Sequence, residues 1–125
     1  ELAYIHAEGF AAGELKHGPI ALIEPGQPVF VVVPSPKGRD PLHSKVVSNI
    51  QEINARGART IVIAEEGDTD VVPYASDVIH VPAAPTLLAP LVTVVPLQVF
   101  ACELAAAKGL DVDQPRNLAK SVTVE

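Results

Sequence analysis

A histidine near the start of the chain is the first side chain that could do chemistry. His17 lies in the run GELKHGP at residues 13–19, directly before Gly18. An imidazole exchanges protons near neutral pH, and a glycine beside it leaves room for a ligand to approach closely. A histidine at the end of a helix is also an ordinary cation that contacts the last carbonyl groups. Residue chemistry alone leaves both interpretations open.

Three glutamates, Glu1, Glu8 and Glu14, are the second kind of candidate. A carboxylate can act as a general base that removes a proton beside a carbonyl group. Glutamates spaced along one predicted helix are also typical of a solvated face. The spacing does not separate these two interpretations.

The third candidate is a lysine in the tail. Lys120 lies within residues 111–125, which read DVDQPRNLAKSVTVE. A lysine amine forms Schiff bases where desolvation or a second cation lowers its pKa, and without such surroundings it is a solvated side chain. The Asp-x-Asp at residues 111–113 is too short a motif to indicate a metal.

Motifs for other chemistry are missing. The sequence contains no dinucleotide-binding GxGxxG, no P-loop, no HExxH and no GxSxG. The four histidines, His6, His17, His43 and His80, are too far apart in the chain to chelate a metal as a local pair. We therefore predict no metal and no cofactor. We expect His80, on an apolar strand, to be a hydrogen-bonded core residue and His43 to be solvated.

Composition excludes two classes of protein. Of the 125 residues, 48% are hydrophobic and 19% are charged, which is unlike a disordered chain. The 9 basic and 15 acidic residues give a net charge of −6. Nucleic-acid affinity comes mostly from cations that meet phosphates, so we predict no nucleic-acid partner.

The single cysteine and the first residue of the chain indicate which cysteine chemistry is possible and how long the protein is. Cys102 cannot form an internal disulfide or a four-thiolate zinc site, and its apolar neighbours predict burial. No signal-peptide pattern is visible, so we predict a cytoplasmic location. The chain begins at Glu1 and contains no methionine, which leads us to expect a piece of a longer protein.

The elements that must position these groups alternate between helix and strand. Residues 29–33 are apolar at every position, as in a strand covered on both faces. Periodicity and turn residues predict helices over residues 1–17, 42–56 and 87–108 and strands over residues 29–33, 60–64 and 78–81. Gly57 is suited to end the second helix. The pattern predicts an α/β fold with a parallel sheet flanked by helices, lacking its N-terminal units.

The last predicted helix has a second interpretation. Residues 87–107 contain one charge, Glu103, and are long enough to cross a bilayer. Pro90 and Pro96 interrupt the run, and a carboxylate within a bilayer is costly. We therefore predict a core helix and no membrane partner.

Two segments resemble one enzyme family. The run ELKHGP at residues 14–19 and the tail at residues 111–125 resemble the C-terminal part of the glucosamine-6-phosphate synthases, the isomerising glutamine–fructose-6-phosphate aminotransferases. YIHAE at residues 4–8 and VPLQ at residues 95–98 extend the resemblance over essentially the whole chain. It implies that residues 1–110 are part of a second sugar-isomerase (SIS) domain of flavodoxin-like type, and that residues 111–125 are an active-site tail.

The resemblance also implies roles for individual residues. Lys120 would form a Schiff base with open-chain fructose 6-phosphate, and Ala119 would lie against the sugar. His17 would help to open the sugar ring, in the site of the neighbouring subunit of a homodimer. Glu1 would move a proton between C1 and C2. These roles suit the residue types, since they require a nucleophilic amine, a group that titrates near neutrality and a base.

The partners implied are fructose 6-phosphate, glucosamine 6-phosphate, and the glutaminase and first sugar-isomerase domains of the parent chain. The serine and threonine residues that hold the sugar phosphate in the family belong to that first domain, so we expect this chain alone to be inactive. The competing hypothesis is a sugar-phosphate-binding regulatory domain without catalysis, since a fold does not decide function.

Overall fold

The structure is a computed structural model that describes residues 1–38 and 41–116. The chain divides into two compact units, one formed by Glu1–Glu8 with the chain from Val95 onward and the other by Gly9–Val94. The second unit contains the whole sheet. Lys120 and Ala119 lie outside the described residues.

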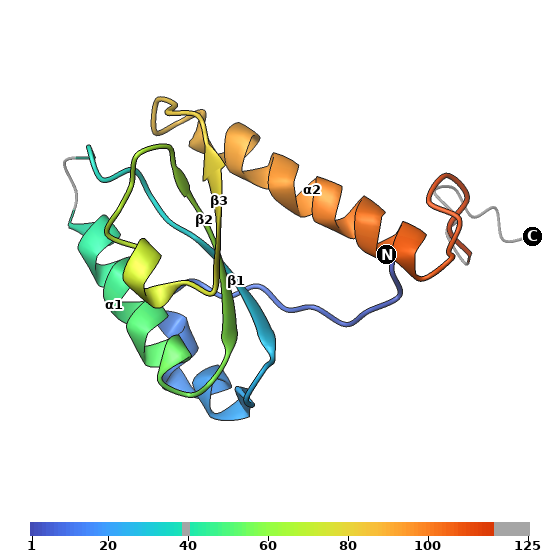
Figure 1. The fold of residues 1–125 in the computed structure, drawn as a ribbon, viewed down its shortest axis with the longest axis horizontal. Coiled ribbons are helices and arrows are strands. Elements are labelled where there is room, and N and C mark those ends of the chain that lie inside the picture. Colours follow the sequence, from blue (N-terminus) through green and yellow to red (C-terminus); the bar gives the residue numbers. More distant parts are fainter. Residues whose placement is uncertain (39–40, 117–125) are drawn as a thin grey trace, which may run out of the picture. The chain divides into compact units, whose positions relative to one another are not determined.

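Three parallel strands form the centre of the second unit (Figure 1). They are β1 (Pro28–Val32), β2 (Arg59–Glu65) and β3 (Asp77–Val81), in the order β1-β2-β3. In the register, Val31 pairs with Val62 and Val62 pairs with Val78. The predicted strands and the parallel α/β fold class are therefore confirmed, with strand bounds that differ by one residue.

Two α-helices and three short 3-10 turns complete the described elements. The helices are α1 (Leu42–Asn54) and α2 (Ala89–Ala107). The turns are η1 (Glu14–His17), η2 (Pro19–Leu22) and η3 (Val72–Tyr74). The two predicted long helices are confirmed with slightly shorter bounds, because helix ends are the positions least determined by periodicity.

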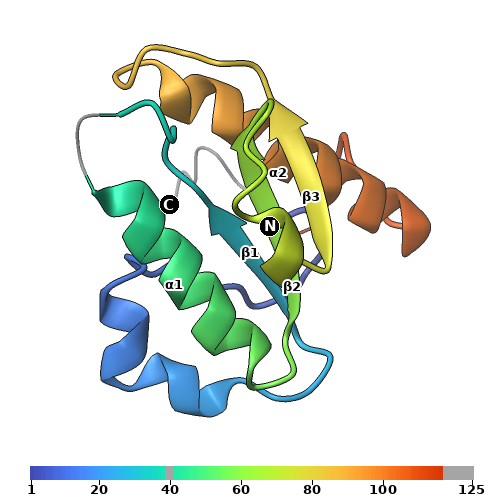
Figure 2. The ribbon, with the colours of Figure 1, turned by 60° about the vertical axis from the view of Figure 1, so that its left-hand side comes forward.

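The core lies between α1 and the sheet. Figure 2 shows α1 lying across one face of the strands. Ile50 on α1 and Val62 on β2 have no exposed surface, and each such buried side chain contributes about 1.5–3 kcal/mol. The core cluster contains Val31, Val33, Val46, Val47, Ile50, Ile53, Ala58, Val62, Ala64 and Val71. This layer fixes the sheet and therefore the loops that follow its strands.

The helix predicted over residues 1–17 is wrong. Residues 1–10 form neither helix nor strand, and only Glu14–His17 makes a 3-10 turn. A helix of this length is stabilised mainly by burial of an apolar face, yet Ile5 and Phe10 are 52% and 48% exposed. Gly9 and Gly13 would each weaken such a helix by about 1 kcal/mol relative to alanine.

Helix α2 is predominantly apolar, with Thr93, Gln98 and Glu103 as its only polar side chains. By length and composition alone it could cross a membrane, and it is the only such helix in the part of the chain that the structure describes. Only 6% of its apolar window is buried, and Ala105 is its one buried residue, so the prediction of a core helix is wrong. Apolar composition does not show whether a helix is covered, and the absence of a membrane partner stays a prediction. Cys102 on α2 is exposed, so its predicted burial is wrong.

Gly57 closes the connection between α1 and β2. Its backbone is left-handed, with φ of +83°, and its N–H donates to the Asn54 carbonyl oxygen at 2.8 Å. A β-carbon at this position would lie 3.3 Å from Pro25 Cα. Its predicted role at the end of the helix is confirmed. The left-handed conformation favours glycine, and the contact with Pro25 would be tight for any larger residue.

We expect Gly57→Ala to lower the free energy of unfolding by more than about 1 kcal/mol, because alanine is strained at this φ and meets Pro25. Gly13→Ala is the matched control, since Gly13 has helical angles, φ −68° and ψ −33°, and open space around it. Urea unfolding followed by circular dichroism measures both. Equal midpoints for the two variants would contradict the strain at Gly57.

Candidate functional site

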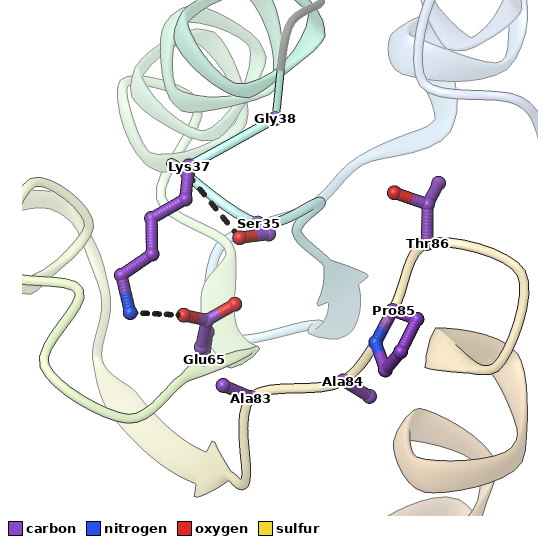
Figure 3. Close-up of a pocket in the computed structure, with 8 residues that line it drawn as sticks. All are labelled: Ser35, Lys37, Gly38, Glu65, Ala83, Ala84, Pro85 and Thr86. Atoms are coloured by element: carbon purple, nitrogen blue, oxygen red, sulfur yellow. Dashed lines mark hydrogen bonds and ion pairs between the residues drawn. The ribbon is translucent and has the colours of Figure 1, made fainter.

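The carboxyl ends of the three strands meet at one edge of the sheet, where ligands bind in open α/β folds. The loops that follow the strands line an open, shallow cavity of about 370 Å³. It is lined by Ser35, Lys37, Gly38, Glu65, Ala83, Ala84, Pro85 and Thr86. Figure 3 shows the Lys37 amine pointing toward Glu65, with residues 83–86 on the other side.

An ion pair dominates this cavity. Lys37 Nζ lies 2.8 Å from Glu65 Oε1, and the Glu65 side chain is 7% exposed while that of Lys37 is 76% exposed. The Lys37 backbone N–H also donates to Ser35 Oγ at 3.2 Å. The loop after β1 is thereby attached to the end of β2.

The pair holds both groups in their charged forms. The hydrogen bond from Lys37, and then one from Ser35, lower the pKa of the Glu65 carboxyl, although its burial acts in the opposite direction. The same contact raises the pKa of the Lys37 amine. A carboxylate and an ammonium that compensate each other suit a polar binding surface better than proton transfer near neutrality.

These two residues were not singled out from the sequence. Their positions in the sequence could have indicated the contact. Glu65 directly follows the predicted strand 60–64, and Ser35 and Lys37 closely follow the predicted strand 29–33. Carboxyl ends of parallel strands share an edge, so polar residues at these positions could have been expected to meet.

A second polar cluster lies where α1 begins. His43 Nε2 is 2.8 Å from Asp68 Oδ2, and both residues are buried. With Asp70 they form a set whose ligand atoms lie within 4.8 Å of one another. The Asp68 carboxylate already has His43 and the Asp70 backbone N–H as partners, so the cluster is explained without a metal.

The predictions for the environments of His43 and His80 are both wrong. His43 is buried rather than solvated, because a carboxylate from the loop after β2 pairs with it. His80 is exposed rather than part of the core, because β3 is an outer strand of the three. Neither environment is visible in a local stretch of sequence.

His17 is the last residue of η1, and it is exposed. Its neighbours hold the turn in place. Leu15 packs against the core cluster, and Lys16 Nζ lies 2.6 Å from Glu52 Oε1 on α1. Gly18, which follows with φ of +146°, separates this turn from η2. The imidazole is therefore presented to solvent from an anchored turn.

Glu1 is exposed and belongs to the other unit. Within that unit, two hydrogen bonds and one cation–ring contact connect its segment to the chain after α2. Lys108 Nζ donates to the Ala3 carbonyl oxygen, and the Arg116 backbone N–H donates to the Tyr4 hydroxyl. The Arg116 guanidinium lies 4.3 Å from the centre of the Tyr4 ring. The segment of Glu1 is thus attached to the start of the tail that contains Lys120.

Comparison with known proteins gives one family and a set of close relatives. A model of the SIS domain matches residues 1–108. Glutamine–fructose-6-phosphate aminotransferases (isomerising) from Corynebacterium diphtheriae and Streptomyces coelicolor are each 78% identical to all 125 residues. The chain spans 20% of the length of these curated relatives.

A solved structure agrees with these relatives. The C-terminal domain of glucosamine-fructose-6-phosphate aminotransferase from Francisella tularensis matches 92% of this chain with 41% identity and a TM-score of 0.81. The chain covers 32% of that structure. The resemblance inferred from the tail and from ELKHGP is thereby confirmed. With the parallel sheet, the helix layer and the family match over residues 1–108 in agreement, the chain belongs to the SIS domain family.

Proposed function

We propose that this chain is the isomerase-domain portion of an isomerising glutamine–fructose-6-phosphate aminotransferase. Such an enzyme converts fructose 6-phosphate and glutamine into glucosamine 6-phosphate and glutamate. The observation that carries the proposal is 78% identity over all 125 residues to relatives of that name. Because the chain spans 20% of their length, the activity is that of a longer parent protein.

In the proposed reaction His17 opens the sugar ring. Ring opening moves a proton from the C2 hydroxyl to the ring oxygen, which an imidazole can mediate near neutral pH. The exposed position of His17 on an anchored turn supports this role. An exposed imidazole is also free to enter the site of the neighbouring subunit of a homodimer.

Lys120 and Glu1 perform the later steps of the proposal. The Lys120 amine adds to the C2 carbonyl and water leaves, which gives a Schiff base. Ammonia from the glutaminase domain then replaces the lysine, so C2 carries an imine. Glu1 removes a proton from C1 and returns one to C2, while the C1 hydroxyl proton moves to the C2 nitrogen, and these transfers convert the 2-imine into a 2-amino aldose. Ala119 lies against the sugar during these steps.

The competing hypothesis, a regulatory sugar-phosphate-binding domain, requires different chemical properties of Lys120. A binding module needs a cation or a hydrogen-bond donor but no nucleophilic amine. Arginine supplies the first two properties and lacks the third. The chemistry of Lys120 therefore separates the two functions.

Borohydride trapping in the full parent protein tests the proposed catalysis. We expect fructose 6-phosphate and borohydride to leave a reduced sugar adduct on Lys120, mapped by peptide mass. Lys120→Arg should remove the adduct, whereas Lys45→Arg, at an exposed position on α1, should retain it. Sugar binding without any adduct on Lys120 would favour the regulatory function.

Hybrid dimers test whether His17 serves the neighbouring subunit. His17→Asn should lower kcat/KM by about 10²–10⁴-fold, the usual contribution of an acid–base group, while exposed His80→Asn leaves it unchanged. Mixed subunits of inactive His17→Asn and Lys120→Arg should recover about a quarter of wild-type activity, because half of the dimers then hold one intact site. If His17 serves its own subunit, the mixture stays inactive.

A further inference from the structure

An ion pair attaches the turn that contains His17 to the last turn of α1. Lys16, the residue directly before His17, places its Nζ 2.6 Å from Glu52 Oε1. The Lys16 and Glu52 side chains are 40% and 39% exposed, so the pair lies at the surface of its unit. Because Lys16 is next to the histidine, the ion pair acts on the end of η1 from which the imidazole projects.

The backbone of η1 holds the start of the turn better than its end. The Glu14 and Leu15 N–H groups both donate to the Ala11 carbonyl oxygen, at 2.9 and 3.2 Å, and the Leu15 side chain packs against the core cluster. At the other end Gly18 follows, with φ of +146°. Glycine is the residue with the greatest backbone freedom, so the direction of the His17 ring depends on a contact made by a side chain.

Glu52 has a rigid support, because α1 is packed on the sheet. Its neighbours Ile50 and Ile53 on the same helix are 0% and 2% exposed. The Arg56 guanidinium also donates to the Glu52 carbonyl oxygen at 2.7 Å, which satisfies a carbonyl group near the end of the helix. The Glu52 carboxylate is therefore a fixed point to which Lys16 attaches the turn.

The point of attachment lies at the end of α1 opposite the cavity of Lys37 and Glu65. That cavity is formed by the loop that leads into α1, whereas Glu52 lies in the last turn of the helix. Leu42 and Glu52 are about 15 Å apart along the helix axis. Figure 2 shows the blue turns beside the lower end of α1, away from the arrowheads of the three strands. The ion pair therefore directs His17 toward a site other than this cavity.

We propose that Glu52 is a positioning residue for the ring-opening step, which acts through Lys16 on the direction of the His17 imidazole. This inference rests on the proposed function, in which His17 moves a proton to the ring oxygen of the sugar. Neither Glu52 nor Lys16 touches the sugar in the proposal. A misplacement of about 1 Å can lower a rate about 100-fold, whereas an exposed ion pair adds little to stability. Loss of the pair should therefore affect the rate more than the folding.

A substrate that needs no ring opening isolates this step in the full parent protein. The analogue 5-deoxyfructose 6-phosphate lacks the C5 hydroxyl that closes the furanose ring, so its C2 carbonyl is always open. We expect Glu52→Lys to lower kcat/KM for fructose 6-phosphate about fivefold, the change in population that an exposed ion pair can enforce. The kcat/KM for the open-chain analogue should keep its wild-type value, because the later steps do not use His17. A general structural defect would lower both values.

Three further variants test whether the pairing of charges is the cause. The double variant Lys16→Glu, Glu52→Lys restores an ion pair and should recover most of the loss. In His17→Asn protein, Glu52→Lys should cause no further loss, because the group that it positions is gone. The matched control is Asp77→Asn, which removes another exposed ion pair of the same unit, with Arg59 at 2.9 Å. It should leave kcat/KM unchanged for both substrates.

The outcomes distinguish this inference from the proposal beneath it. An unchanged kcat/KM for fructose 6-phosphate in folded Glu52→Lys protein, or an equal loss on the two substrates, would overturn the positioning role and leave the proposed function intact. A charge swap that recovers nothing would overturn it as well, since pairing with Lys16 would then not be the cause. If His17→Asn loses as much on the open-chain analogue as on fructose 6-phosphate, His17 does not open the ring, and both are overturned.

Discussion

The burial of α1 against the central strand β2 is the interaction on which the described sheet depends. Ile50 on the helix and Val62 and Ile63 on the strand have no exposed surface. The helix is also the crossover that joins β1 to β2, so its packing forces the two strands to run parallel. Parallel strands end at one edge, and this brings Lys37 and Glu65 together across 28 positions of chain. The cavity at that edge is thus a consequence of the hydrophobic layer.

The charges around this core are compensated locally. Glu65 and Asp68, both almost without solvent contact, pair with Lys37 and His43, respectively. A buried carboxylate without a partner would cost several kcal/mol. None of the buried side-chain nitrogen or oxygen atoms of the described residues lacks a hydrogen-bond partner. The groups of the proposed chemistry are different in kind, because Glu1 and His17 are exposed and therefore available to a substrate.

The sequence predicted those features of the fold that depend on a short stretch of chain, and it missed those that depend on distant contacts. Strands β1 and β2 were predictable because their apolar, β-branched runs suit a strand covered on both faces. Helix α1 was predictable from the spacing of Val46, Ile50 and Ile53. The prediction of a helix over residues 1–17 was wrong because apolar spacing does not show whether the apolar face of a helix is buried. The prediction that His43 is solvated was wrong for a related reason. Its partner Asp68 is 25 positions away and lies in the loop after β2.

The same limit applies to the candidate site. Neither periodicity nor spacing indicated that Tyr4 and Arg116 meet, because a contact across 112 positions leaves no local pattern. Family resemblance identified Lys120, Glu1 and His17 as residue types in matching motifs, but a motif does not specify what holds a flexible side chain in place. A lysine amine must be confined before it can react at one carbon. Within the unit that contains both residues, the Tyr4–Arg116 contact attaches the segment of Glu1 to the chain that precedes the tail lysine.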